Sequence, residues 1–155
     1  MRFRACAAVC LVLKRENEIL ISLRQNTGYR DGEWGLVSGH VEEGEGIIDA
    51  IIRETKEEAD IEVERNDLKV VHVIYSRDVR DDFSYINFFV TCEKYSGEIR
   101  NAEPYKCGGL RFCKYNKLPI NTVDMVKIAL KNIEKGILFT EINLTRTNFC
   151  HSRGT

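Results

Sequence analysis

The segment GHVEEGEGIIDAIIRETKEEADI, residues 39–61, carries eight acidic side chains and only two basic ones, Arg53 and Lys56. The 155-residue chain as a whole is nearly neutral, with a formal net charge of -1. Like charges crowded on one short segment repel one another, so this uneven distribution needs an explanation. Either the segment is a solvated acidic surface, or it binds something that carries positive charge.

A helix is predicted over about residues 46–59, because apolar side chains recur there with helical spacing. At 100° per residue, one contiguous face is mostly apolar and should pack on a sheet. Glu54, Glu57 and Glu58 occupy the adjoining sector at spacings of three and four residues, so their carboxylates should converge. Ala50 lies in the same sector one turn earlier, where its small side chain should leave open space. The packing face consists of Ile47, Ile48, Ile51, Ile52, Thr55 and Ala59.

A divalent cation would relieve the repulsion among these three carboxylates. Arg53 can pair with Glu57 one turn later, but one arginine cannot neutralise three glutamates. Mg²⁺ prefers oxygen ligands and is usually shared between carboxylates and the phosphates of a substrate. The glycines Gly44 and Gly46 before the helix suit a phosphate-bearing ligand, since backbone groups near a helix start are free. Charge runs are most often solvated surfaces, but these carboxylates border the buried face, which favours a site.

The charged residues of this segment match the signature of the Nudix hydrolases, G-x5-E-x7-R-E-U-x-E-E-x-G-U, where U is usually aliphatic. The first glycine is Gly39, the first glutamate is Glu45, and the other charged positions lie within residues 53–58. Two positions depart from the signature, because Asp60 replaces its last glycine and Thr55 replaces an aliphatic residue. The helix is expected to end at residue 60 in a left-handed conformation, which Asp tolerates better than most residues.

The resemblance extends over about residues 3–139 and implies an α/β/α sandwich, in which a mixed β-sheet lies between helices. It implies hydrolysis of a pyrophosphate bond in a nucleoside diphosphate linked to another group, with Mg²⁺ or Mn²⁺ as cofactor. Arg53 would orient the glutamates, and either Glu57 or Glu54 would be the general base. The metal ligands implied by the resemblance are the carbonyl of Gly39 and the carboxylates of Glu54, Glu57 and Glu58. Glu45 would contact the metal through a water molecule or would support the direct ligands.

Four residues outside the signature are further candidates. Glu103 is a candidate for an extra metal ligand or base, because some Nudix enzymes supply a glutamate from a loop at about this place, but a surface turn before Pro104 explains it equally well. Arg24 either contacts a substrate phosphate or base, or is an exposed arginine at a strand end. Trp34 either stacks on a nucleobase or belongs to the core. Tyr29 carries the same ambiguity.

The predicted elements form one mixed α/β domain over residues 1–140. Residues 25–38 are rich in turn formers and are expected to be a loop. The polar residues 141–155 are expected to form a poorly ordered tail. Strands are expected over residues 3–13, 18–24, 68–76 and 83–94, with shorter ones near residues 98–100 and 110–114.

A second helix is predicted within residues 122–136. Asn121 or Thr122 should cap its start, and Gly136 should end it. Its apolar stripe consists of Val123, Val126, Leu130 and Ile133.

The composition argues against several other classes of protein. A pI near 6.3 gives no basic excess for nucleic acid or an anionic membrane. No apolar run approaches the length of a membrane span. The six cysteines include no CxxC pair and no histidine at zinc-ligand spacing, which favours scattered reduced thiols over disulfides or zinc. We therefore expect a cytoplasmic monomer or homodimer with neither nucleic-acid nor membrane partners.

The first hypothesis is a Mg²⁺-dependent Nudix pyrophosphohydrolase that acts on a nucleoside triphosphate or another nucleoside diphosphate derivative. A nucleoside triphosphate is the first expectation, because the chain is short and shows no added N-terminal domain. The alternative is a non-catalytic nucleotide-binding or regulatory Nudix domain. Such domains usually lose glutamates of the signature, and this chain keeps them all. A structural or protein-interaction role is the third hypothesis.

Overall fold

The computed structural model describes residues 2–78 and 83–144. No helix within these residues is long and apolar enough to cross a bilayer. The strands are β1 (Cys6–Arg15), β2 (Glu18–Arg24), β3 (Trp34–Gly35), β4 (Ser38–His40), β5 (Lys69–Asp78), β6 (Phe83–Cys92), β7 (Cys107–Lys114) and β8 (Phe139–Leu144). The helices are α1 (Ile47–Ala59), the 3-10 turn η1 (Arg65–Asp67) and α2 (Asp124–Glu134).

The strands form one mixed sheet in the order β3-β2-β1-β6-β5-β8, with β4 paired to β1 and β7 paired to β2. β1 and β6 run parallel over eight residue pairs that begin with Cys6 opposite Tyr85. β4 runs antiparallel to β1, with Gly39 opposite Val9. This pairing holds the start of the acidic segment against the middle of the sheet.

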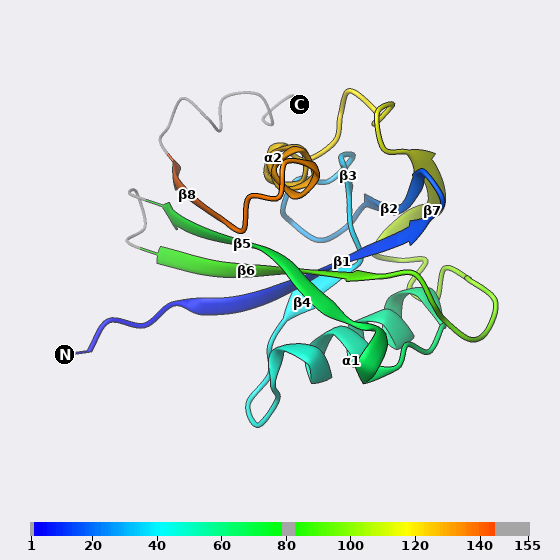
Figure 1. The fold of residues 1–155 in the computed structure, drawn as a ribbon, viewed down its shortest axis with the longest axis horizontal. Coiled ribbons are helices and arrows are strands. Elements are labelled where there is room, and N and C mark those ends of the chain that lie inside the picture. Colours follow the sequence, from blue (N-terminus) through cyan, green and yellow to red (C-terminus); the bar gives the residue numbers. More distant parts are fainter. Residues whose placement is uncertain (1, 79–82, 145–155) are drawn as a thin grey trace.

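The two long helices cover opposite faces of the sheet (Figure 1). Side chains alternate along β1, so Val9 and Leu11 pack in the apolar cluster of α1 whereas Val12 packs in that of α2. Each helix contributes a fully buried side chain, Ile51 from α1 and Leu130 from α2. Two apolar clusters, one on each face, confirm the α/β/α sandwich with a mixed sheet.

Helix α1 begins and ends where the spacing of its apolar residues predicts. The carboxylate of Asp49 accepts a hydrogen bond from the backbone amide of Gly46 at 3.0 Å, which satisfies a free donor before the first turn. Asp60 follows the last helical residue in the left-handed conformation, with φ of 56°. Its carboxylate forms ion pairs with Lys56 and Arg100. The departure at residue 60 therefore keeps the backbone shape that glycine would give.

The structure corrects one predicted loop and one predicted strand. Residues 25–38 are not an uninterrupted loop, because they contain β3 and the first residue of β4. Residues 98–100 form no strand. The backbone amide of Arg100 donates instead to the carbonyl of Ala59 at 3.0 Å, so this segment packs on the end of α1.

Strand β8 extends past residue 140, where the domain is expected to end. β8 continues to Leu144 because it pairs in parallel with β5, from Phe139 opposite Val73 onward. The rest of the expected tail, residues 145–155, lies outside the described residues.

The predicted side-chain cap of α2 is also wrong. The hydroxyl of Thr122 donates to the carbonyl of Pro119 at 2.7 Å, and the amide of Asn121 donates to another loop. Val123 precedes the helix, and its backbone amide donates to the carbonyl of Trp34 at 2.8 Å. A contact with β3 therefore fixes the start of α2, which local sequence could not reveal.

Candidate active site

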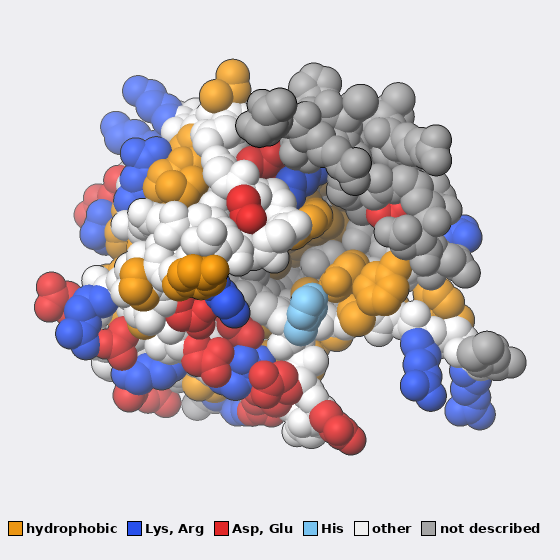
Figure 2. All heavy atoms as spheres, turned by 180° about the vertical axis from the view of Figure 1, so that it is seen from behind, with side chains coloured by type: hydrophobic (Ala, Val, Ile, Leu, Met, Phe, Trp, Pro, Cys, Tyr) orange, Lys and Arg blue, Asp and Glu red, His pale blue; other side chains and the backbone are white. Residues whose placement is uncertain are grey.

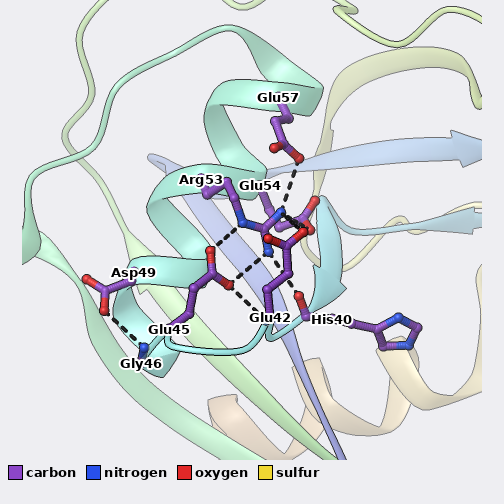
Figure 3. A network of polar contacts seen from close by, with 8 residues as sticks. All are labelled: His40, Glu42, Glu45, Gly46, Asp49, Arg53, Glu54 and Glu57. Carbon is purple, nitrogen blue, oxygen red and sulfur yellow. Dashed lines mark hydrogen bonds and ion pairs between the residues drawn. The ribbon is translucent and has the colours of Figure 1, made fainter.

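One arginine of α1 lies at the centre of an acidic cluster (Figure 3). The guanidinium of Arg53 donates two hydrogen bonds to Glu45, at 2.5 and 3.0 Å. It also donates to Glu54 at 2.7 Å, to Glu57 at 3.2 Å and to the carbonyl of His40 at 3.0 Å. The hydrogen bonds to Glu45 and Glu54 raise the pKa of Arg53, so it stays charged. Arg53 thus holds three of the predicted site glutamates in one group.

The carboxylate of Glu54 lies directly over Gly39 of β4. A Cβ atom at residue 39 would overlap this carboxylate, so only glycine fits there without displacing it. Glu54 is 9% exposed, and this burial raises its pKa, whereas the hydrogen bond from Arg53 lowers it. The first residue of the signature therefore creates room for the glutamate fifteen residues later.

Glu58 is the glutamate whose charge is least stabilised. Its carboxylate accepts a hydrogen bond from the backbone amide of Ser38 at 3.0 Å. Burial raises the pKa of Glu58 to about 8, and the charge of Glu54 adds to that effect, while Ser38 and Arg24 oppose it. An anionic Glu58 at neutral pH would be stabilised by further positive charge.

Glu57 differs from its two neighbours because water reaches it. Its side chain is 48% exposed, compared with 11% for Glu54. The hydrogen bond from Arg53 fixes one carboxylate oxygen, Oε2, and the second is available to another group. Of the two candidates for general base, Glu57 is thus the one with open access to solvent.

The open space expected beside Ala50 does not exist. Ala50 is fully buried in the apolar cluster of α1, together with Ile51 and Ala59. Its small side chain allows the helix to approach the sheet closely. Asp49, in contrast, is exposed to solvent and forms an ion pair with Arg65.

The loop that carries Glu103 reaches the acidic cluster. The backbone amide of Ala102 donates to the carbonyl of Glu58 at 3.1 Å, which attaches this loop to the last turn of α1. Burial is the main cause of the raised pKa of Glu54 and of Glu58, and the charge of Glu103 adds to both. The structure therefore places Glu103 near two predicted metal ligands.

Arg24 and Tyr29 contact each other at the end of β2. The Nε of Arg24 donates to the backbone carbonyl of Tyr29 at 2.8 Å, and its guanidinium carbon lies 5.4 Å from the centre of the tyrosine ring. Arg24 also lowers the pKa of Glu58, against the larger effect of burial. Tyr29 is 45% exposed. Arg24 is therefore close enough to act on the charge of Glu58, and Tyr29 lies beside Arg24.

Trp34 is placed differently from the other substrate candidates. It lies in β3 and packs against the apolar cluster of α2. The guanidinium carbon of Arg111 lies 4.5 Å from the centre of its ring. These contacts favour the core alternative for Trp34 over stacking on a nucleobase.

Two backbone groups of the site were missed by sequence reasoning. The amide of Ser38 binds Glu58, and the carbonyl of His40 binds Arg53. Both belong to β4, whose position depends on pairing with β1. Side-chain type gives no signal for such groups, because any residue supplies the same backbone atoms.

The acidic cluster has the donor chemistry for a hard divalent cation. Every side-chain donor is a carboxylate oxygen, the kind of ligand that Mg²⁺ and Mn²⁺ prefer. In residues 2–78 and 83–144, no group of three or more His, Cys, Asp or Glu side chains is already arranged to hold a metal ion. Burial is the main cause of the raised pKa values of Glu54 and Glu58, and a cation beside them would stabilise their anionic forms. Figure 2, which shows the molecule from behind, has acidic side chains (red) gathered in one area with basic side chains (blue) among them.

Comparison with known proteins finds a family model, sequence relatives and solved structures that are similar to this chain. A family model described as the NUDIX domain matches residues 3–133. An ADP-ribose pyrophosphatase of Methanocaldococcus jannaschii is 31% identical over 121 residues, which are 78% of this chain and 69% of the relative. The crystal structure of a MutT NUDIX hydrolase from Burkholderia pseudomallei has a TM-score of 0.75 and 26% identity, covering 83% of this chain and 98% of that one. The crystal structure of a MutT protein from Bacillus halodurans has a TM-score of 0.74 and 17% identity, and the match covers 92% of each chain. At this identity the similarity supports the fold only.

Proposed function

The chain belongs to the Nudix hydrolase family, whose members act on pyrophosphate bonds, and on this basis we propose that it is a Mg²⁺-dependent pyrophosphohydrolase of nucleoside diphosphate derivatives. The observation that carries the proposal is the acidic cluster around Arg53, with Glu54 lying over Gly39. The cluster keeps every charged residue of the signature in one group. A purely structural helix would have no reason to collect these charges beside its buried face.

The residues that would hold the cation are Glu54, Glu57, Glu58 and the backbone of Gly39, with Glu45 in support. When bound, Mg²⁺ or Mn²⁺ would neutralise phosphate charge and acidify the attacking water. Without a cation, the cluster would repel a pyrophosphate, because both are negative. Arg53 fixes the positions of Glu45, Glu54 and Glu57 and holds the loop before α1 in place.

Glu57 is proposed as the general base that accepts the proton of the attacking water. It is the most accessible carboxylate of the helical group, and its orientation is fixed by Arg53. Glu103 is the second candidate, because its charge acts on both Glu54 and Glu58. Arg24 is proposed to bind a phosphate of the substrate from the other side of the cluster, where it lies beside Tyr29.

ADP-ribose is the first compound to test as substrate, because the relative that is 31% identical is named an ADP-ribose pyrophosphatase. The protein should be incubated with ADP-ribose, nucleoside triphosphates, dinucleotides and nucleotide sugars, with Mg²⁺, with Mn²⁺ and with EDTA. We expect cleavage of at least one compound only when the metal is present. Absence of cleavage across the panel would refute the proposal.

Two variants identify the base. Glu57→Gln should abolish most turnover if Glu57 is the base, whereas Glu103→Gln should then reduce it only slightly. The opposite ranking would assign the role to Glu103. Mg²⁺ binding by each variant, measured by calorimetry, separates the loss of a base from the loss of a metal ligand.

A further inference from the structure

The loop of residues 100–107, which carries Glu103, is attached to the end of α1. The backbone amides of Arg100 and Ala102 donate to carbonyls in the last turn of this helix, the second of them to Glu58 at 3.1 Å. We call residues 100–107 the Glu103 loop. Its first half is thus fixed by the backbone of the helix that carries the predicted metal ligands.

The side chain of Glu103 faces the molecule. Glu103 is partly buried, whereas Ala102, Pro104 and Tyr105 around it are exposed. Its charge also acts on Glu58, where it adds to the larger effect of burial in raising the pKa. Both observations place the Glu103 carboxylate on the side of the loop that meets the acidic cluster.

Asn101 fixes the turn that begins at Glu103. Its side-chain oxygen, Oδ1, accepts a hydrogen bond from the backbone amide of Glu103 at 3.2 Å, and its side-chain amide donates to the carbonyl of Cys107 at 2.7 Å. The carbonyl of Glu103 accepts from the backbone amides of Lys106 and Cys107, at 3.0 and 2.9 Å, which closes the same turn. An Asn side chain that bonds the backbone two residues on is a common means of setting a turn. Asn101 therefore spans this turn from its first residue to its last.

The connection between β2 and β3 holds the same turn from the other side. The side-chain amide of Gln25 donates to the carbonyl of Pro104 at 2.7 Å, and its backbone amide donates to the carbonyl of Lys106 at 3.0 Å. The side-chain amide of Asn26 donates to the carbonyl of Tyr105 at 2.8 Å. Three successive carbonyls of the Glu103 loop are thus bound by two residues that follow β2.

We propose that Asn101 is a positioning residue that keeps the carboxylate of Glu103 beside Glu58, with Gln25 as a second support of the same turn. The inference rests on the proposed function, since the position of Glu103 matters when the acidic cluster binds a divalent cation. Asn101 would act on the cation only through Glu103, because both polar groups of its side chain are bound to the backbone of the loop. A carboxylate strengthens cation binding only while it is held close, because the attraction falls with distance.

A role in connecting β6 to β7 does not account for this arrangement. Ordering a segment costs conformational entropy, and burial of apolar surface usually offsets that cost. Ala102 and residues 104–106 are exposed, so the Glu103 loop gains little from burial and is held mainly by hydrogen bonds. Such a firmly held loop is what a functional carboxylate requires, because small displacements at a catalytic site have large effects.

Mn²⁺ binding tests the positioning role without any substrate. Calorimetry on the full chain should show that Glu103→Gln weakens Mn²⁺ binding by about fivefold, the order of effect expected from removing one nearby charge. Asn101→Ala should weaken binding by about two- to fivefold, because a displaced carboxylate loses part of the same attraction. In a Glu103→Gln background, Asn101→Ala should have no further effect, since it acts only through that carboxylate. Gln25→Ala should show the same pattern with a smaller change.

Asn132→Ala is the matched control. It removes a side-chain amide hydrogen bond of similar length, 2.8 Å to the hydroxyl of Thr140, on the helix that covers the other face of the sheet. It should lower the melting temperature as Asn101→Ala does and leave Mn²⁺ affinity unchanged. Hydrogen exchange gives a readout independent of the metal, because the backbone amides of Lys106 and Cys107 should exchange faster in Asn101→Ala.

The inference has several ways to fail. It is overturned if the wild type does not bind Mn²⁺, if Glu103→Gln binds Mn²⁺ as the wild type does, or if Asn101→Ala and Gln25→Ala both do. It is also overturned if Asn101→Ala weakens binding equally with and without Glu103, or if Asn132→Ala weakens it as much.

The hydrolysis panel separates this inference from the proposed function. Cleavage by the wild type, with Mn²⁺ affinity independent of Asn101, would keep the activity and remove the positioning role. Failure of the whole panel, with Mn²⁺ affinity still dependent on Asn101 through Glu103, would overturn the enzymatic proposal alone.

Discussion

The two long helices pack on the same sheet, but they bury different kinds of side chain. The buried residues of α2 are all apolar, namely Val126, Ala129 and Leu130. Those of α1 include Glu54 and Thr55 beside its apolar residues. Burying a carboxylate or a hydroxyl costs free energy unless it is well paired. The difference indicates that α2 serves packing, whereas α1 gives up some stability to build a site.

The free-energy cost of burying Glu54 and Thr55 is only partly offset by interactions within α1. Arg53 pairs with Glu54 and Glu57, but the pKa of Glu54 is still raised by burial. The hydroxyl of Thr55 is buried, and it has no hydrogen-bond partner in the part of the chain that the structure describes. Four substitutions test this contrast between the helices.

The largest expected effect is on turnover. Glu57→Gln should lower kcat by about 10²- to 10⁴-fold, because the amide cannot accept the proton of the attacking water. The melting temperature should change little, since this side chain is half exposed. Glu134→Gln, an exposed glutamate at the end of α2, is the matched control and should keep full activity. A Glu57→Gln enzyme with normal kcat would remove the functional distinction between the helices.

The next effect is on stability and concerns α2. Leu130 is 1% exposed, so Leu130→Ala should lower the free energy of unfolding by about 2–5 kcal/mol, through lost burial and the cavity left behind. Chemical denaturation measures this change, and Ile128→Ala on the exposed side of α2 should cost far less. Where Leu130→Ala is folded, its kcat/KM should equal that of the wild type. A matching loss of kcat/KM would show that α2 is not a packing helix alone.

Gly39→Ala tests the contact between β4 and α1. The added methyl group would overlap the carboxylate of Glu54 and displace it. We expect kcat/KM to fall by about 10²-fold, since a displacement of one ångström in a catalytic site has an effect of that order. Gly109→Ala is the control, because its new methyl group would meet nothing closer than 4.0 Å. Unchanged activity in Gly39→Ala would mean that Glu54 does not act from its observed position.

The smallest effect is a gain of stability. Thr55→Val keeps the shape of the side chain and removes the buried hydroxyl, so it should raise the free energy of unfolding by about 1 kcal/mol. Denaturant unfolding measures this gain, with Thr91→Val as the control, because the hydroxyl of Thr91 donates to the carbonyl of Val12. A loss of stability in Thr55→Val would show that the hydroxyl is satisfied by water.

Local periodicity was sufficient to predict α1 and its acidic group. The i, i+3 and i+4 spacing of Glu54, Glu57 and Glu58 is a property of the helix itself, and the apolar face follows from the same geometry. The predictions failed at residues whose surroundings are set by contacts with distant parts of the chain. Ala50 was expected to border open space, but close approach of the sheet buries it. Residues 98–100 were expected to be a strand, but their backbone bonds to the end of α1.

The sequence by itself determined both helices and the convergence of Glu54, Glu57 and Glu58, because these follow from side-chain spacing within single elements. The order of strands and helices indicated a mixed α/β domain, and the α/β/α sandwich followed from the resemblance to the Nudix signature. The position of β4 was decided by its pairing with β1, and this pairing brings Ser38 to Glu58 and Gly39 under Glu54. The stacking of the His40 ring on the Tyr85 ring likewise depends on β4 and β6 both pairing with β1. Such contacts join residues far apart in the chain, and no local pattern encodes which backbone atoms or ring faces will meet.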